Sequence, residues 1–145
     1  MIYFTSNFGI EFIKSFESFR PIVYICPGGA RTIGYGHVLA KDEHYSRISY
    51  ETAETLLKLD LANVEKSVLR NINPAISQNQ FDALVSFTFN VGAAALQRST
   101  LRQKINYGSS MDEISREFLN WIYAKGKRLN GLVSRRMLEA SIYGR

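Results

Sequence analysis

The chain begins with hydrophobic residues at helical spacing. Ile10, Ile13 and Phe16 lie three residues apart, which is the repeat that places side chains on one face of a helix. Thr5 and Ser6 stand before them, and either can cap the first turn by accepting a backbone N–H. The pattern therefore predicts a first helix over about 6–17.

The pattern changes over residues 20–48. Proline and glycine interrupt any helical repeat there, and short runs of β-branched and aromatic residues lie between them at 22–25 and 31–35. Such runs favour strands, whereas clustered proline and glycine favour turns. We therefore expect two short strands joined by a glycine-rich turn.

Helical spacing returns after this segment. A stripe of leucine and valine predicts a long helix over 49–70. Ser77 and Gln80 have the spacing of a capping box, which begins a helix that is apolar nearly all round and is expected to end at Gly92. Three further helices are expected, over 99–107, 111–121 and 132–143.

These elements predict an α+β fold that is mostly α. Strands are confined to one segment and helices occupy the rest, which is typical of this class. The length of 145 residues is that of one domain. We expect a single domain over 1–145, with a β lobe over about 18–48, a connecting helix over 49–70 and a helical lobe over 71–145. A cleft between the two lobes is a natural place for a site.

Composition excludes several classes of protein. With 46% hydrophobic and 12% aromatic residues, the chain has the composition of a packed globule and not of a disordered segment. The single cysteine excludes an internal disulfide and a zinc site with two thiolate ligands.

The net charge of +5 is concentrated in the last third of the chain. Residues 1–95 carry eight basic and nine acidic residues, whereas 96–145 carry ten basic and four acidic residues. Such a surface either aids solubility or attracts a polyanion. No nucleic-acid-binding motif accompanies it, and no apolar run approaches the roughly 20 residues that span a bilayer. We expect no nucleic-acid partner, no stable membrane insertion and no signal peptide.

The candidate chemistry begins at Glu17. At the end of the predicted first helix, the negative end of the helix dipole and the neighbouring Phe16 and Phe19 favour the neutral carboxylic acid. A carboxylic acid that stays neutral near pH 7 is what a general acid requires. The alternative is an ordinary surface glutamate.

Cys26 and Thr32 lie on either side of the predicted turn. The thiol is either a reactive group or a small hydrophobe, and the Thr32 hydroxyl either holds a water molecule or belongs to an ordinary strand residue. Gly34 and Gly36 permit a close backbone approach to a ligand or a bend in the strand.

The order and spacing of these residues resemble the phage-type lysozymes of glycoside hydrolase family 24. Glu17, Cys26 and the segment Thr32-Ile33-Gly34-Tyr35-Gly36-His37 match the family's signature, in which many members have Asp where Cys26 stands. Two more blocks look like the family's and follow in the same order: 80–92, which contains Asn90, and 121–139, which contains Arg135, Arg136 and Glu139.

The resemblance implies a lysozyme-like fold and an endolysin that hydrolyses the β-1,4 bond between N-acetylmuramic acid and N-acetylglucosamine in bacterial peptidoglycan. By matching position, Glu17 would protonate the glycosidic oxygen and Thr32 would help to position the attacking water. Cys26 would be a thiolate base, a water-holding group or a space-filler. We favour the water-positioning role, which would give inversion.

Substrate binding or support of the cleft would then fall to Gly34, Tyr35, Gly36, His37, Asn90 and Arg135. We expect His37 to be a structural residue bonded to a carboxylate. One arginine of the Arg135–Arg136 pair could face the cleft and pair with Glu17, or both could lie on a helix surface. Family members need no metal ion or organic cofactor.

The resemblance also implies a monomer that stays in the host cytoplasm until a holin-type lesion releases it, and that then reaches the periplasm and the peptidoglycan layer to cause lysis. Three alternatives stay open. They are a non-catalytic cell-wall-binding module, membrane disruption by a basic amphipathic helix over 132–143, and a lytic transglycosylase that forms anhydro-muramic ends without water.

Overall fold

The computed structural model describes residues 3–145. About 57% of the chain is helical and the strands form two small antiparallel sheets, so the predicted mostly α fold of the α+β class is confirmed. The helices are α1 (Asn7–Phe16), α2 (Tyr50–Asn71), α3 (Gln78–Val91), α4 (Ala93–Arg98), α5 (Thr100–Tyr107), α6 (Met111–Phe118) and α7 (Asn130–Tyr143). The strands are β1 (Arg20–Ile25), β2 (Arg31–Gly34) and β3 (His37–Val38) in one sheet, and β4 (Tyr123–Ala124) and β5 (Lys127–Arg128) in the other.

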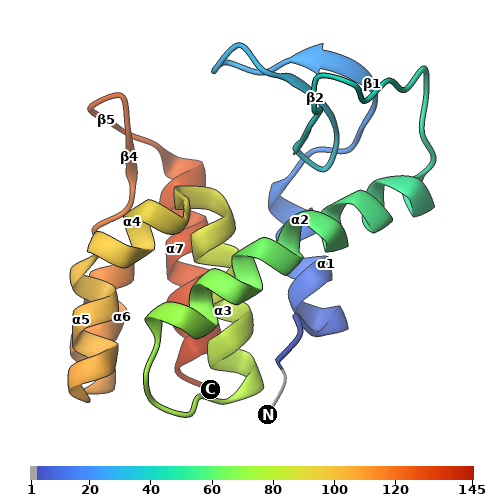
Figure 1. The fold of residues 1–145 in the computed structure, drawn as a ribbon. Coiled ribbons are helices and arrows are strands. Elements are labelled where there is room, and N and C mark those ends of the chain that lie inside the picture. Colours follow the sequence, from blue (N-terminus) through green and yellow to red (C-terminus); the bar gives the residue numbers. More distant parts are fainter. Residues whose placement is uncertain (1–2) are drawn as a thin grey trace.

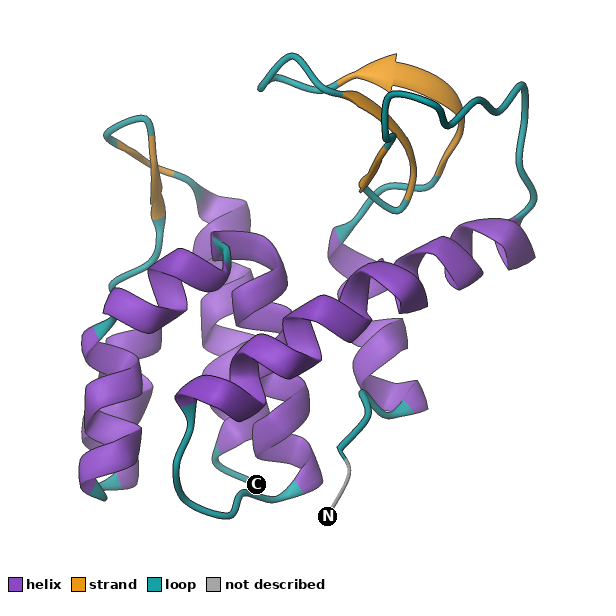
Figure 2. Cartoon of the chain, in the orientation of Figure 1, coloured by secondary structure: helices purple, strands orange, loops and turns teal. Residues whose placement is uncertain are grey.

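The long helix α2 joins two lobes of unequal size. Figure 1 shows the β1–β2–β3 sheet beside the first half of α2, and helices α3 to α7 gathered around its other end. The small β4–β5 hairpin projects from the helical lobe on the same side as the sheet (Figure 2). Among residues 3–145, no helix combines the length and the hydropathy that a membrane span requires.

The helix α3 forms the centre of the core, as its all-round hydrophobicity predicts. Phe81, Leu84 and Phe87 are fully buried, and α3 packs against α1, α2 and α7. The predicted capping box is present, because Ser77 accepts from the backbone N–H of Gln80 at 3.1 Å and donates its own backbone N–H to the Gln80 side chain at 3.0 Å.

Helix α1 is held directly against α3. A Cβ atom at Gly9 would lie 2.7 Å from the Asp82 side chain, so only glycine allows this approach. Asp82 also accepts the backbone N–H of Ser6 at 3.0 Å and bonds the Ser6 hydroxyl, and Ser6 in turn caps α1 by accepting from Gly9. These contacts fix the position of α1 and of Glu17, which follows it.

The β sheet packs on α2 through a second close approach. Gly34 has a positive φ of 69°, and a Cβ atom there would lie 3.2 Å from the Cβ of Ala53 in α2. The sheet pairs β1 with β2 and β2 with β3 in antiparallel register. The two predicted strands are therefore present, although the second ends at Gly34 and the short β3 was not predicted.

Three further differences from the predicted elements lie in the helical lobe. Helix α4, with only six residues, is too short to show a helical stripe. The predicted helix over 111–121 ends at Phe118, and the following chain forms the unpredicted β4–β5 hairpin, whose turn places Lys125 and Gly126 at positive φ. Two-residue strands leave no alternation to detect. Helix α7 begins at Asn130, two residues earlier than predicted.

Candidate active site

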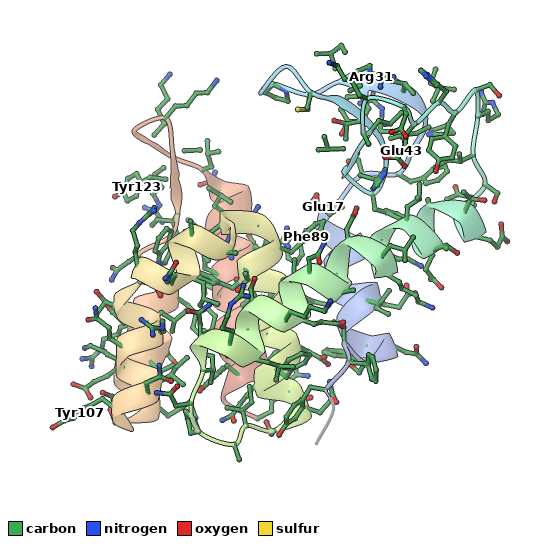
Figure 3. All side chains as sticks on the ribbon, in the orientation of Figure 1. Glu17, Arg31, Glu43, Phe89, Tyr107 and Tyr123 are labelled. Atoms are coloured by element: carbon green, nitrogen blue, oxygen red, sulfur yellow. The ribbon has the colours of Figure 1, made fainter. Side chains whose placement is uncertain are left out.

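Glu17 lies where the first helix ends, as predicted. Its backbone N–H donates to the carbonyl oxygens of Ile13 at 3.1 Å and Lys14 at 3.2 Å, and its φ and ψ are extended, so the chain leaves α1 at this residue and continues into β1. The side chain is 25% exposed. Figure 3 shows it at the top of α1, directed toward the space beneath the β sheet.

The Glu17 side chain lines a cavity of about 320 Å³. The cavity lies between the end of α1, the end of α3 and the beginning of α7, and its lining residues are Phe16, Glu17, Asn90, Leu129, Gly131, Leu132 and Arg135. One acidic side chain and one basic side chain thus meet in a largely apolar hollow, an arrangement that is common in ligand sites.

Arg135 faces Glu17 across this cavity. Its Nη1 lies 3.6 Å from Glu17 Oε1, and the Arg135 side chain is only 4% exposed. The guanidinium carbon also lies 5.3 Å from the centre of the Phe16 ring, within cation–π range. One of the two alternatives for the arginine pair is therefore found, since Arg135 faces Glu17. The buried guanidinium thus places a positive charge beside the Glu17 carboxyl group.

A buried carboxylate holds Arg135 in place. Glu139 is fully buried and accepts from Arg135 Nε at 3.2 Å, from the Ser86 hydroxyl at 2.5 Å and from Arg136 Nη1. Arg135 also donates to the Ser86 carbonyl oxygen at 3.1 Å. Burial raises the pKa of Glu139, and the two arginines and the Ser86 hydroxyl oppose that rise.

Arg136 extends this network to Asn90 and to the hairpin. The fully buried guanidinium donates to the Asn90 Oδ1 atom and to the Trp121 carbonyl oxygen at 3.0 Å. Asn90 Oδ1 already accepts a hydrogen bond from Arg136. The amide NH2 group of Asn90 is therefore the end that is left to bind a ligand, and it binds as a donor. Burial lowers the pKa of Arg136, although Glu139 opposes the shift.

Cys26 directly follows β1 and Thr32 lies in β2, on either side of the connecting turn, and neither residue lines the Glu17 cavity. The Thr32 hydroxyl donates to the Ala30 carbonyl oxygen at 3.0 Å, and Thr32 is only 2% exposed. Hydrogen bonds from the Ala30 backbone N–H, and secondarily from Thr32, lower the pKa of the Cys26 thiol. The Thr32 hydroxyl has one proton, which it donates to the Ala30 carbonyl oxygen and cannot also donate to the Cys26 sulfur. We therefore attribute the lowered pKa of Cys26 chiefly to the Ala30 N–H.

The segment 34–37 supports the β lobe and does not line the cavity. Tyr35 is buried in the core beside Phe19, and Gly36 has a positive φ in the turn before β3. His37 bridges two carboxylates, with Nδ1 2.9 Å from Asp60 and Nε2 3.1 Å from Glu43. The prediction that His37 bonds a carboxylate is confirmed.

Phe19, which stands two residues after Glu17 in the sequence, does not line the Glu17 cavity. Phe19 packs on Tyr50, with ring centres 4.2 Å apart, and on Tyr35. Phe16 therefore remains as the aromatic residue that lines the Glu17 cavity.

Sequence reasoning also missed the residues that hold Arg135. Ser86 lies in the helix that the sequence predicts to be apolar, and Glu139 lies in the 121–139 block, where the sequence assigns it no role. The spacing of Glu139 from Arg135 and Arg136, four and three residues along a helix, was the available signal. In the part of the chain that the structure describes, no cluster of three or more His, Cys, Asp or Glu side chains could hold a metal ion.

Comparison with known proteins supplies the family. The family model described as Phage lysozyme matches residues 14–139. The chain belongs to the phage lysozyme family. The chain is 41% identical to an endolysin of Bacillus phage B103 over 140 residues, which are 95% of this chain and 53% of that protein. It is 38% identical to an endolysin of Acyrthosiphon pisum secondary endosymbiont phage 1, over 95% of this chain and 96% of that protein.

Solved structures agree with this family. The muramidase domain of SpmX from Asticaccaulis excentricus has a TM-score of 0.89 and 35% identity, covering 98% of each chain. A P22 lysozyme mutant has a TM-score of 0.87 and 31% identity, covering 100% of each chain. The chain spans about half the length of the B103 relative. The family match contains Glu17, Cys26, Thr32 and Arg135.

Proposed function

We propose that this phage lysozyme is an endolysin that hydrolyses the β-1,4 bond between N-acetylmuramic acid and N-acetylglucosamine in peptidoglycan. The observation that carries the proposal is the Glu17 carboxyl group on the wall of an open cavity, with Arg135 3.6 Å away. The family match supports a peptidoglycan-cleaving glycosidase. Our proposal goes one step beyond the family match by naming the glycosidic bond that is cleaved.

Glu17 acts as the general acid in this proposal. It protonates the glycosidic oxygen as the bond breaks, and it becomes a carboxylate at that moment. Arg135 then lies close enough to stabilise the new negative charge. Because the guanidinium is buried and held by Glu139, it does not have to move when the proton leaves Glu17. A charged group fixed in advance is the arrangement that favours a transition state in which charge develops.

The attacking water approaches from the β lobe. A glycosidase usually has two carboxyl groups, but the cavity lined by described residues contains the single carboxyl group of Glu17. We assign the positioning of the water to Thr32 in β2, assisted by Cys26, which directly follows β1. An attack by water on the face opposite the leaving group inverts the anomeric centre. The predicted product is therefore the inverted sugar.

The same proposal covers the setting of the enzyme. We infer that the chain is a single-domain monomer, remains in the host cytoplasm until a holin-type lesion releases it, and then causes lysis from the periplasmic peptidoglycan layer. The names of the relatives support an endolysin. The basic C-terminal third of the chain supports attraction to an anionic wall.

The ends of digested glycan strands test the reaction. Purified peptidoglycan is digested to completion and the soluble fragments are separated by chromatography. The mass of each fragment is then measured by mass spectrometry before and after borohydride reduction. The proposal predicts reducing muramic acid ends. Anhydro-muramic ends would instead indicate a lytic transglycosylase, reducing glucosamine ends would indicate cleavage of the other glycosidic bond, and binding without new ends would indicate a wall-binding module.

A further inference from the structure

The β4–β5 hairpin carries positive charge beside the proposed active site. Residues 123–131 are all exposed, and they include Lys125, Lys127 and Arg128. None of the ion pairs found within residues 3–145 involves these three side chains. Their charges are therefore available to an anionic ligand.

A second cavity joins the hairpin to the Glu17 cavity. It measures about 310 Å³ and is lined by Asn90, Val91, Trp121, Tyr123, Ala124 and Leu132. Asn90 and Leu132 line both cavities, so the two hollows adjoin. Figure 3 shows Tyr123 on the hairpin and Glu17 at the end of α1, with the ends of α3 and α7 between them. A ligand in the Glu17 cavity can therefore continue toward the hairpin.

The hairpin register places its cations at the edge of this second cavity. Tyr123 pairs with Arg128, and Ala124 pairs with Lys127. Directly opposite residues in an antiparallel pair have Cβ atoms about 5 Å apart. Both residues of β4 line the cavity, so each has a basic neighbour from β5. The apolar hollow thus has a cationic rim.

We propose that the hairpin subsite, defined as Trp121, Tyr123, Lys127 and Arg128, binds the carboxylates of the peptide stem of peptidoglycan. This inference rests on the proposed function, because the stem branches from the muramic acid residue beside the bond to be cleaved. The N-acetylated sugars of the strand are neutral once the stem is attached, so the stem carboxylates are the anionic groups that accompany the bond. A ligand in two adjoining cavities brings these carboxylates to the cations.

Binding to insoluble peptidoglycan tests the subsite. The protein with Glu17→Gln serves as the background, so that the ligand is not digested during co-sedimentation. Three ligands are compared: intact peptidoglycan, the same material with its carboxyl groups converted to amides, and stem-free glycan attached to beads. For the stem-free glycan, an amidase removes the stems and the lactyl carboxyl groups that it frees are then converted to amides. Lys127→Gln with Arg128→Gln is compared with Lys66→Gln with Arg98→Gln, which removes two exposed charges from α2 and α4.

The subsite predicts that the hairpin variant binds intact peptidoglycan more weakly by about two- to five-fold for each cation, as exposed ion pairs allow. On amidated or stem-free material, the hairpin variant and its parent should bind equally. An equal loss in the Lys66/Arg98 variant would indicate general attraction to wall polyanions and overturn the proposal. So would an equal loss on stem-free glycan, or no loss at all.

A different result would show that the proposed function, and not the hairpin subsite, is wrong. With Glu17 intact, the release of reducing ends from stem-free glycan reports glycosidic cleavage alone. If no ends appear from any of the three ligands, the proposed reaction is wrong. In that case, the binding measurements on the Glu17→Gln background would still test whether the hairpin subsite binds carboxylates.

Discussion

The Arg135 guanidinium lies 3.6 Å from the Glu17 carboxyl group and is almost fully buried. A buried guanidinium needs a counter-charge, and Glu139 supplies it from one turn further along α7. Glu139 also pairs with Arg136. The position of the charge that faces Glu17 is therefore set by a carboxylate that does not itself line the cavity.

The first prediction concerns Glu139. Glu139→Gln removes the negative charge from between two buried arginines while keeping the shape of the side chain. Because it leaves buried charge uncompensated, we expect the free energy of unfolding to fall by about 3–5 kcal/mol. Denaturant unfolding followed by circular dichroism measures this change.

The matched control is Glu51→Gln. Glu51 is an exposed residue in the first turn of α2, where removal of a charge should cost less than about 1 kcal/mol. If Glu139→Gln also costs less than about 1 kcal/mol, the buried network does not stabilise the helical lobe and the role assigned to Glu139 is wrong.

The second prediction concerns pH. Burial lowers the pKa of His37, but hydrogen bonds to Asp60 and then to Glu43 outweigh burial and raise it. A histidine whose pKa is raised on folding stabilises the fold fully below its unfolded pKa of about 6.5, and this stabilisation disappears as the pH rises through the folded value. We therefore expect the free energy of unfolding to decrease as the pH rises above about 6.5.

His37→Gln should remove this part of the pH dependence, because glutamine does not titrate. The control is His44→Gln, at the other histidine of the chain, which is exposed. Unfolding measured in denaturant between pH 5 and pH 9 compares the three proteins at about 0.5-unit steps. A decline above pH 6.5 that persists in His37→Gln but is absent from His44→Gln would contradict the assignment.

The third prediction concerns Cys26. If Cys26 helps to hold water, Cys26→Ser should keep most of the activity, because a hydroxyl also forms hydrogen bonds. If the thiolate is the general base, the same change should cost about 100-fold or more. The rate of reducing-end release from peptidoglycan distinguishes the two outcomes.

Thr32→Val is the companion variant for this test. It removes the hydroxyl that donates to Ala30 at 3.0 Å and keeps the shape of the side chain. We expect a larger loss of activity from Thr32→Val than from Cys26→Ser. The reverse order would assign the water to Cys26 in place of Thr32.

Much of the fold could be predicted from the sequence because the main helices repeat their hydrophobic residues over several turns. Helices α1, α2 and α3 and the Ser77 cap were predicted within about two residues. The β4–β5 hairpin was missed because each strand has two residues and its turn is Lys125-Gly126, which is a weak turn signal.

The candidate site was predictable in part. Glu17 and Arg135 could be named from their positions along the chain, but their approach depends on the contact between α1 and α3 at Gly9, which no local pattern specifies. The burial of Glu139 could not be predicted either. A glutamate on an amphipathic helix is usually exposed, whereas here Glu139 is buried in a helix that packs on α3 and α6.

The most direct test of the central claim is the rate of reducing-end release by Glu17→Gln. The control is Glu11→Gln, on the same helix but with a side chain that is 70% exposed. We predict that Glu17→Gln loses at least about 100-fold in rate while its unfolding midpoint stays close to that of the unmodified protein, and that Glu11→Gln keeps full activity. A folded Glu17→Gln protein that still released reducing ends at the unmodified rate would contradict the account.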